Sequence, residues 1–254
     1  MNITWNADKY TSDFSFVYKY GEGVTELLEL PRNSLVIDLG CGNGALSGLL
    51  REKGFRVVGM DASAEQLALA KRSFPDISFI QADATDFTAA EPAEAVFSNA
   101  VFHWIDREKQ PDMLSCIYRA LKPGGQLVFE MGGHGNCGRI HKALAEQFEK
   151  RGSKYVTGKF FPTIGEYSDL LEQAGFEVRY ATLFERPTEL KGDDGAAGWI
   201  EMFAKNAFGV ITDENERREI IRSAADSLRG ELFRDGKWYA DYVRLRMKAV
   251  KPAE

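Results

Sequence analysis

The sequence places three glycines within five positions: Gly40, Gly42 and Gly44. They follow directly after the apolar run 35–39, which contains Asp38. Glycine is unfavourable inside strands and helices, so the cluster indicates a turn with unusual backbone angles or close approach to a ligand. The N–H groups of this turn, including that of Cys41, suit an anionic or polar ligand group at the start of a helix. Packing alone is the alternative explanation.

Two more aspartates end apolar runs. Asp61 closes the run 56–61, and Asp83 closes the run 77–83. A carboxylate in the first position can accept hydrogen bonds from the two hydroxyls of a ribose, and one in the second can accept from the amine of an adenine. The alternative for Asp61 is a role at the start of the next helix, although Ser63 is the better cap there.

Asp38 distinguishes between possible nucleotides. Inside a buried strand its carboxylate needs partners, either amides of the turn or the ammonium group of a ligand. The pyrophosphate of a dinucleotide would meet like charge beside these carboxylates. A nucleoside that carries a cationic amino-acid group fits better.

The elements that would position these residues alternate along the chain. Strands are expected at 35–39, 56–61, 77–83, 94–99 and 126–131, and helices at 45–54, 63–74 and 112–121. Ser63 and Gln66 have the spacing of a capping box at the start of the second helix. The alternation predicts βαβ units and a parallel sheet that binds ligands at the carboxyl ends of its strands.

Beyond residue 131 the regular alternation of strands and helices ends. Helices are expected at 138–152 and 163–175, a strand at 176–185, and two helices within 196–230. The stretch 237–250 reads as a strand or a short helix, and its alternation favours a strand. Residues 186–236 therefore form a helical insertion before the last strand, which we expect to act as a lid or a wall of the substrate site.

Five stretches together resemble class I S-adenosylmethionine-dependent methyltransferases: VIDLGCGNG, VVGMDAS, FIQADATDF, AVFSNAVFHWI and LKPGGQLVFE. The segment before residue 30 resembles the leader of the small-molecule branch that includes trans-aconitate methyltransferase. The resemblance implies an α/β, Rossmann-like sheet of seven strands, six parallel and the last antiparallel, with helices on both faces. It implies one methyltransferase domain over 1–254, with an N-terminal helical arm (1–34) and a cofactor-binding core (35–131).

The resemblance also implies S-adenosylmethionine as the cofactor, and roles for single residues. The implied cofactor-binding residues are Asp38, Gly40, Cys41, Gly42, Asp61, Ala62, Gln66, Asp83, Ala84 and Asn99. In this assignment Asp38 and the glycine turn hold the methionine portion, and Asn99 lies near the sulfonium. Gln66 is a departure, since many relatives carry methionine there against the adenine ring.

Methyl transfer to a small-molecule acceptor relies mainly on proximity and orientation. A base is needed only if the acceptor arrives protonated, and His103 and His134 are the candidates. His103 and Trp104 are equally suited to forming a wall of the pocket, and His141 is expected on a helix surface. Predicted acceptor contacts are Tyr10, Trp104 and Trp199, although core packing is the alternative for Trp199.

Composition limits the other possibilities. The net charge of −6 argues against a nucleic-acid substrate, and three cysteines without a CxxC pair predict neither disulfides nor a metal site. No signal-peptide core or long apolar run is evident, so a cytoplasmic protein without a membrane partner is expected. A nicotinamide-dependent oxidoreductase and a non-catalytic S-adenosylmethionine-binding protein are the alternative functions.

Overall fold

The computed structural model describes residues 16–191 and 195–253. These residues form two compact units. Unit 1 takes in the described residues up to Met131, then Pro162–Leu183 and those from Leu245 on, and unit 2 consists of Gly132–Phe161 and Phe184–Arg244.

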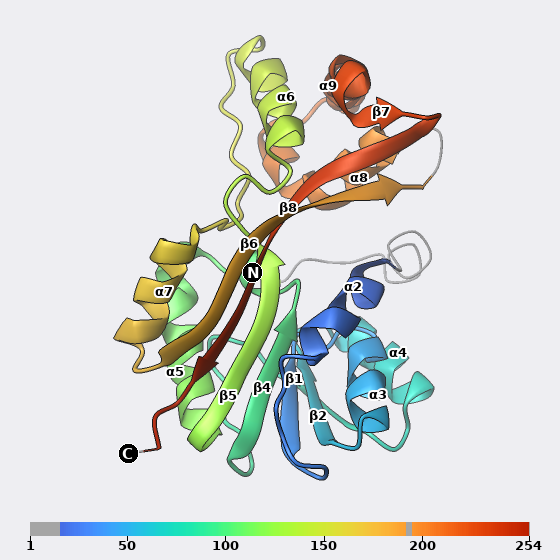
Figure 1. Cartoon of the computed structure of the whole chain (residues 1–254). Coiled ribbons are helices and arrows are strands. Elements are labelled where there is room, and N and C mark those ends of the chain that lie inside the picture. Colours follow the sequence, from blue (N-terminus) through green and yellow to red (C-terminus); the bar gives the residue numbers. More distant parts are fainter. Residues whose placement is uncertain (1–15, 192–194, 254) are drawn as a thin grey trace. The chain divides into compact units, whose positions relative to one another are not determined.

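The sheet contains the predicted strands in the order β3-β2-β1-β4-β5-β8-β6 (Figure 1). Their bounds are β1 Leu35–Leu39, β2 Arg56–Asp61, β3 Ser78–Gln81, β4 Ala93–Asn99, β5 Leu121–Gly132, β6 Glu177–Leu190 and β8 Lys237–Val250. Strands β1 to β5 are parallel to one another. Lys251 pairs with Gly125 and Arg246 with Glu130, so β8 runs antiparallel to β5. The predicted sheet with a final antiparallel strand is confirmed, and the short strand β7 (Phe233–Arg234) pairs with β8 in addition.

Helices cover both faces of the sheet in unit 1 (Figure 1). Helices α2 (Phe16–Thr25), α3 (Ala45–Glu52) and α4 (Ala64–Ser73) lie on one face, and α5 (Gln110–Ala120) and α7 (Ile164–Gln173) on the other. Val128 packs with Val24 and Leu50. The next residue, Phe129, instead contacts the ring of Tyr167 at 5.2 Å between centroids. Consecutive residues of a strand point to opposite faces of the sheet, so Val128 packs against the helices on one face and Phe129 against those on the other.

Parallel pairing brings the polar ends of the strands to one edge. Leu39 of β1 is in register with Met60, Asp61 with Gln81, and Asn99 with Glu130. The residues that end β1, β2, β3 and β4 therefore follow one another along the carboxyl edge of the sheet.

Three strand ends differ from the prediction. Strand β6 continues to Leu190 and does not end at residue 185, so the first residues of the predicted insertion belong to this strand. Strand β5 begins at Leu121 and not at residue 126, with an irregularity because Leu121 pairs with Ala93 and Gln126 with Ala95. The residues between them bulge out of the ladder around Gly124, whose φ is 77°. Strand β3 ends at Gln81, so Asp83 lies in the turn that follows the strand.

Unit 2 contains α6 (Gly138–Glu149), α8 (Gly195–Phe203), the 3₁₀ segment η3 (Lys205–Val210) and α9 (Glu214–Leu232). The predicted helical insertion is present, since α8, η3 and α9 lie between β6 and β8 in the chain. A tight turn at Asp235 and Gly236, with φ of 51° and 75°, joins β7 to β8. This Asp-Gly pair is a hairpin signal that the sequence analysis passed over.

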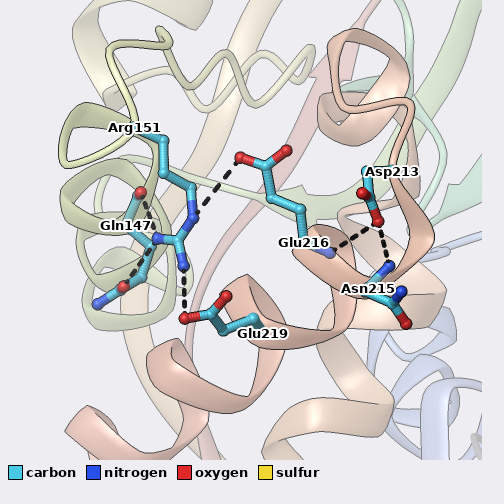
Figure 2. A network of polar contacts seen from close by, with 6 residues as sticks. All are labelled: Gln147, Arg151, Asp213, Asn215, Glu216 and Glu219. Carbon is cyan, nitrogen blue, oxygen red and sulfur yellow. Dashed lines mark hydrogen bonds and ion pairs between the residues drawn. The ribbon is translucent and has the colours of Figure 1, made fainter.

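Arg151 ties α6 to the start of α9 (Figure 2). Its guanidinium donates to the main-chain oxygen of Gln147 and lies 3.8 Å from Glu216 and 3.4 Å from Glu219. Asp213 caps α9 by accepting the N–H of Glu216, and that of Asn215. The two helices are thus joined by charged groups near the surface of the unit.

No helix among the described residues combines the length and the apolar character needed to cross a bilayer. Over the same residues, no group of three His, Cys, Asp or Glu side chains is arranged to hold a metal ion.

Candidate functional site

The glycine turn has the left-handed backbone that its composition predicts. Gly40, Gly42 and Gly44 have φ of 77°, 54° and 81°. A Cβ on Gly40 would lie 2.2 Å from Val101, so no other residue fits there without displacing the loop that follows β4. A Cβ on Gly42 would meet only the side-chain oxygen of Gln66, at 3.9 Å. Gly40 is therefore fixed by packing, whereas the turn at Gly42 faces open space.

Asp61 joins the end of β2 to this turn. One carboxylate oxygen accepts the N–H of Gly42 at 2.9 Å, and the other accepts the N–H of Ser63 at 2.8 Å. Burial raises the pKa of Asp61, and these backbone hydrogen bonds oppose the shift. Ser63 caps α4 as predicted, by accepting the N–H of Gln66. Asp61 takes the Ser63 N–H that a full capping box would give to the Gln66 side chain.

Asp38 is buried in β1 and accepts a hydrogen bond from the Ser47 hydroxyl at 2.5 Å. Burial raises the pKa of Asp38 to about 7, the charge of Asp61 acts in the same direction, and the Ser47 hydrogen bond opposes both. A buried carboxylate whose pKa is raised by burial and by a neighbouring negative charge favours a cation as its ligand. The sequence analysis missed Ser47, whose signal was a hydroxyl on the buried face of α3.

The ends of β2 and β3 carry the residues predicted to meet an adenine. The carbonyl of Ala62 accepts a hydrogen bond from Gln81 at 3.0 Å. Asp83 is exposed, and one of its oxygens accepts both the N–H and the hydroxyl of Thr85, which lowers the pKa of Asp83. Ala84 follows, half-buried, in the same turn. Asp83 is therefore ionised at neutral pH and its second oxygen is available for a donor.

The loop after β4 contacts the glycine turn. Asn99 ends the strand, and Ala100 adopts a left-handed φ of 62° while donating its N–H to the carbonyl of Glu130. Helix α2 passes close to Asn99, because a Cβ on Gly21 would lie 3.1 Å from the Asn99 amide nitrogen. Val101 then packs against Gly40.

His103 and Trp104 lie on the next turn, the 3₁₀ segment η1 (Phe102–Trp104), with His103 buried and Trp104 half-buried. Gln110 holds this turn: its amide donates to the carbonyls of Phe102 and Ile105, both at 2.9 Å.

The Tyr167 hydroxyl of α7 donates to Gln110 at 2.8 Å, and neither side chain is exposed to solvent. The sequence analysis did not identify Gln110 or Tyr167, because only the fold brings them beside the loop.

The other predicted residues belong to unit 2 or lie outside the described residues. His134 is exposed in the turn after β5. Trp199 is buried in α8 and donates its indole N–H to the Tyr242 hydroxyl at 2.7 Å. Tyr10 falls outside the described residues.

The expected surface position of His141 is wrong. The segment 155–161 and α8 pack over the start of α6, so the imidazole is half-buried and lies 5.7 Å from the Phe161 ring and 5.8 Å from Trp199. Its Nδ1 is 2.7 Å from the Tyr155 hydroxyl. Burial lowers the pKa of His141 to about 3, and the charge of Lys159 adds to the shift.

Comparison with known proteins agrees with this geometry. A family model described as a methyltransferase domain matches residues 36–125. The chain is 32% identical to an uncharacterized methyltransferase of Schizosaccharomyces pombe over 97% of this chain and 98% of that protein. It is 30% identical to a trans-aconitate 2-methyltransferase of Rhizobium leguminosarum over 98% of this chain and 100% of the relative. The crystal structure of a SAM-dependent methyltransferase from Methanosarcina mazei has the same fold, with a TM-score of 0.57, 18% identity, and 89% of this chain and 95% of that one covered.

Proposed function

Because the chain belongs to the class I S-adenosylmethionine-dependent methyltransferases, we propose that it methylates a small acceptor that carries a carboxylate. Relatives that span the whole chain are named trans-aconitate 2-methyltransferases, and this supports the acceptor class. The family assignment also argues against a nicotinamide-dependent oxidoreductase.

The residues at the carboxyl edge fit S-adenosylmethionine. Besides the carboxylate of its amino-acid end, this molecule presents an ammonium, a sulfonium, two ribose hydroxyls and an adenine amine, all of which are cations or hydrogen-bond donors. The carboxyl edge provides three carboxylates that can accept hydrogen bonds from these groups: Asp38, Asp61 and Asp83. A side chain on Gly42 would fill the open space beside them. The observation that carries the proposal is the placement of two carboxylates: Asp38 is buried at the end of β1, Asp61 is joined to the glycine turn, and Gly42 between them borders open space. A bound cation would offset the desolvation that raises the pKa of Asp38.

When bound, S-adenosylmethionine supplies a methyl group activated by a sulfonium, which leaves as a neutral thioether. The chain's own residues then have to hold the two substrates, orient them and exclude water. Such positioning lowers the activation free energy by about 7–11 kcal/mol in favourable cases. We assign Asp61 to the ribose hydroxyls, Asp38 and the glycine turn to the amino-acid end, and Asp83 with Ala62 and Ala84 to the adenine. Gln66, beside Gly42, covers the ring with its methylene groups in this assignment.

A carboxylate acceptor is ionised at neutral pH, so its methylation needs no general base. In that case His103 and Trp104 form a wall of the acceptor site, and His103 acts as a base only towards acceptors that arrive protonated. His103→Ala should then spare turnover of carboxylates and lower turnover of phenols or amines. We assign the acceptor cover to the insertion 186–236, and we assign Trp199 to the acceptor contacts of this insertion.

Calorimetric titration with S-adenosylmethionine and S-adenosylhomocysteine tests the cofactor assignment. Asp61→Ala should weaken both affinities about tenfold or more, because a ribose hydroxyl loses its charged acceptor. Asp76→Ala is the matched control, since Asp76 is an exposed carboxylate of unit 1 paired with Arg51. Equal affinities for wild type and Asp61→Ala would remove Asp61 from the site.

Release of S-adenosylhomocysteine in the presence of carboxylates tests the reaction itself. Formation of a methyl ester supports the proposal. Tight cofactor binding with no transfer to any member of a broad panel of acids, phenols and amines would instead identify a non-catalytic cofactor-binding protein.

A further inference from the structure

Unit 2 contains a group of aromatic and basic side chains, of which the mechanism above uses only Trp199. We call it the His141 cluster: His141, Tyr155, Lys159, Phe161, Trp199, Phe203 and Tyr242. Its members come from α6, the segment 155–161, α8 and β8. The rings of Tyr155, Phe161 and Trp199 lie 5.7–5.9 Å from the imidazole. Most members are half-buried, so the cluster extends from the interior of unit 2 to its surface.

One buried polar atom of the cluster lacks a hydrogen-bond partner among the described residues. His141 Nδ1 is engaged by the Tyr155 hydroxyl at 2.7 Å, whereas Nε2 is buried and has no hydrogen-bond partner in the part of the chain that the structure describes. Buried polar atoms of native proteins are almost always paired, so this nitrogen calls for a partner that the described residues do not supply.

The neighbouring groups decide what that partner is. Burial raises the pKa of Tyr155, so its hydroxyl keeps its proton and can donate it to His141 Nδ1. In that tautomer Nε2 carries hydrogen and is a donor. Lys159, whose ammonium donates to the carbonyl of Phe203 at 2.5 Å, is near enough for its charge to act on the imidazole. An N–H donor beside a cation, within aromatic walls, selects an anion with an apolar body.

We propose that the His141 cluster binds a carboxylate group of the acceptor, with the Nε2–H of His141 and the ammonium of Lys159 as its partners and the rings against its carbon skeleton. The inference rests on the proposed function and names the residues that recognise its substrate. His141 and Lys159 are binding residues in this assignment and take no part in proton transfer.

The experiment uses the full chain labelled with ¹⁵N-histidine and saturated with S-adenosylhomocysteine. The sequence has three histidines, so the spectrum is simple and His141→Gln assigns the relevant signals. Titration with trans-aconitate should leave His141 in the Nε2–H tautomer and shift the signals of Nε2 and its attached proton as they donate to the carboxylate, and the uncharged trimethyl ester should not. Unmoved His141 signals at concentrations that saturate methyl transfer would overturn the proposal.

Two variants give a second readout by calorimetry. Lys159→Met and His141→Gln should each weaken trans-aconitate binding about tenfold or more while leaving the affinity for S-adenosylhomocysteine unchanged. Lys154→Met is the matched control, because Lys154 is exposed on the same segment. Wild-type affinity for trans-aconitate in both variants would contradict the inference. If a variant fails to fold, the histidine signals still test the inference on wild-type protein.

The arms separate this inference from the function on which it rests. Failure of wild-type protein to bind S-adenosylhomocysteine defeats the proposed function. Normal binding of S-adenosylhomocysteine, with a carboxylate bound elsewhere than at His141, defeats only the present inference.

Discussion

The carboxyl edge of the sheet in unit 1 and the His141 cluster in unit 2 make opposite electrostatic demands. In unit 1, burial raises the pKa of Asp38 and Asp61, so a cation would relieve the desolvation of two carboxylates. In unit 2, burial lowers the pKa of His141 and Lys159, so an anion would relieve the desolvation of two basic groups. Methyl transfer from a sulfonium to a carboxylate brings together one ligand of each kind. Under the proposed function, unit 1 would bind the cationic substrate and unit 2 the anionic one.

The two regions also differ in what holds them. The cofactor edge depends on backbone geometry: left-handed glycines, N–H groups given to Asp61, and a loop locked against Gly40. The His141 cluster depends on side chains from separate segments that meet only in the folded unit. Backbone changes should therefore be most damaging in the first region, and side-chain changes in the second.

The largest effect is expected from Gly40→Ala. Its methyl group would overlap Val101 and also impose a left-handed backbone on alanine. We expect a loss of about 3 kcal/mol in the free energy of unfolding, combining about 1–2 kcal/mol of backbone strain with a similar cost for overpacking. Urea titration measures the stability, and calorimetry the binding of S-adenosylhomocysteine, which should be abolished.

Gly124→Ala separates the two causes. Gly124 has the same φ of 77°, but nothing lies within 4 Å of its Cβ position. This variant should lose only the strain, about 1–2 kcal/mol, and keep its cofactor affinity. Equal losses for the two variants would mean that Val101 gives way and that packing does not fix the turn.

The second effect concerns the loop that carries His103 and Trp104. Tyr167→Phe removes the hydroxyl that donates to buried Gln110, so stability should fall by about 1–3 kcal/mol. Affinity for S-adenosylhomocysteine should be unchanged, whereas KM for the acceptor should rise as the loop loosens. Tyr180→Phe, at an exposed tyrosine of unit 1, is the control. A change in cofactor affinity with no change in KM would contradict this role.

The third effect is a pair of pH dependences of opposite sign. Free Asp38 has a pKa of about 7, and a bound cation requires its ionised form. Affinity for S-adenosylmethionine should therefore rise with pH up to about 7 and then level off, by no more than about tenfold per pH unit. Asp38→Asn should remove the slope. A flat profile for wild type would show that Asp38 does not sense the ligand charge.

Carboxylate binding should respond in the other direction. Burial lowers the pKa of Lys159 to about 8, and an anion binds the protonated amine. Affinity should be constant well below pH 8 and fall above it, and Lys159→Met should abolish this fall. If both ligands gained affinity over the same pH range, the electrostatic contrast between the units would be lost.

The same contrast explains what the sequence could predict. Asp38, Asp61 and Asp83 each follow an apolar strand pattern, and parallel strands necessarily bring their carboxyl ends together. The antiparallel last strand was expected from the family resemblance alone, and the order of the strands in the sheet was not predicted. The aspartates at the strand ends and the Ser63 cap could be predicted from the residues themselves. Each of these features is encoded in a short stretch of chain.

Tertiary packing decided the rest. His141 looks like any polar residue of an amphipathic helix, and only the segment 155–161 and α8 make it half-buried. Gln110 is an unremarkable residue at the start of a helix until α7 brings the Tyr167 hydroxyl to it. The bulge in β5 was missed because the Pro123-Gly124 pair predicts a turn. It gives no sign that Leu121, which precedes the pair, is already paired with β4.

The smallest effect is expected from the charged contacts that join α6 to α9 (Figure 2). Arg151→Met removes two ion pairs and the hydrogen bonds to Gln147, yet Glu219 remains 70% exposed and solvent screens the charges. We expect a loss of about 0.5–1 kcal/mol, which high salt reduces. Arg51→Met in unit 1 removes a single pair whose partner Asp76 is 78% exposed, and it should cost less still. Thermal unfolding at low and high salt measures both. The His141 cluster is held by ring contacts and not by these ion pairs, so affinity for a carboxylate should be unchanged in Arg151→Met. A loss of this affinity would mean that the α6–α9 contact positions His141. Unit 2 would then be less preorganised than its side-chain packing indicates.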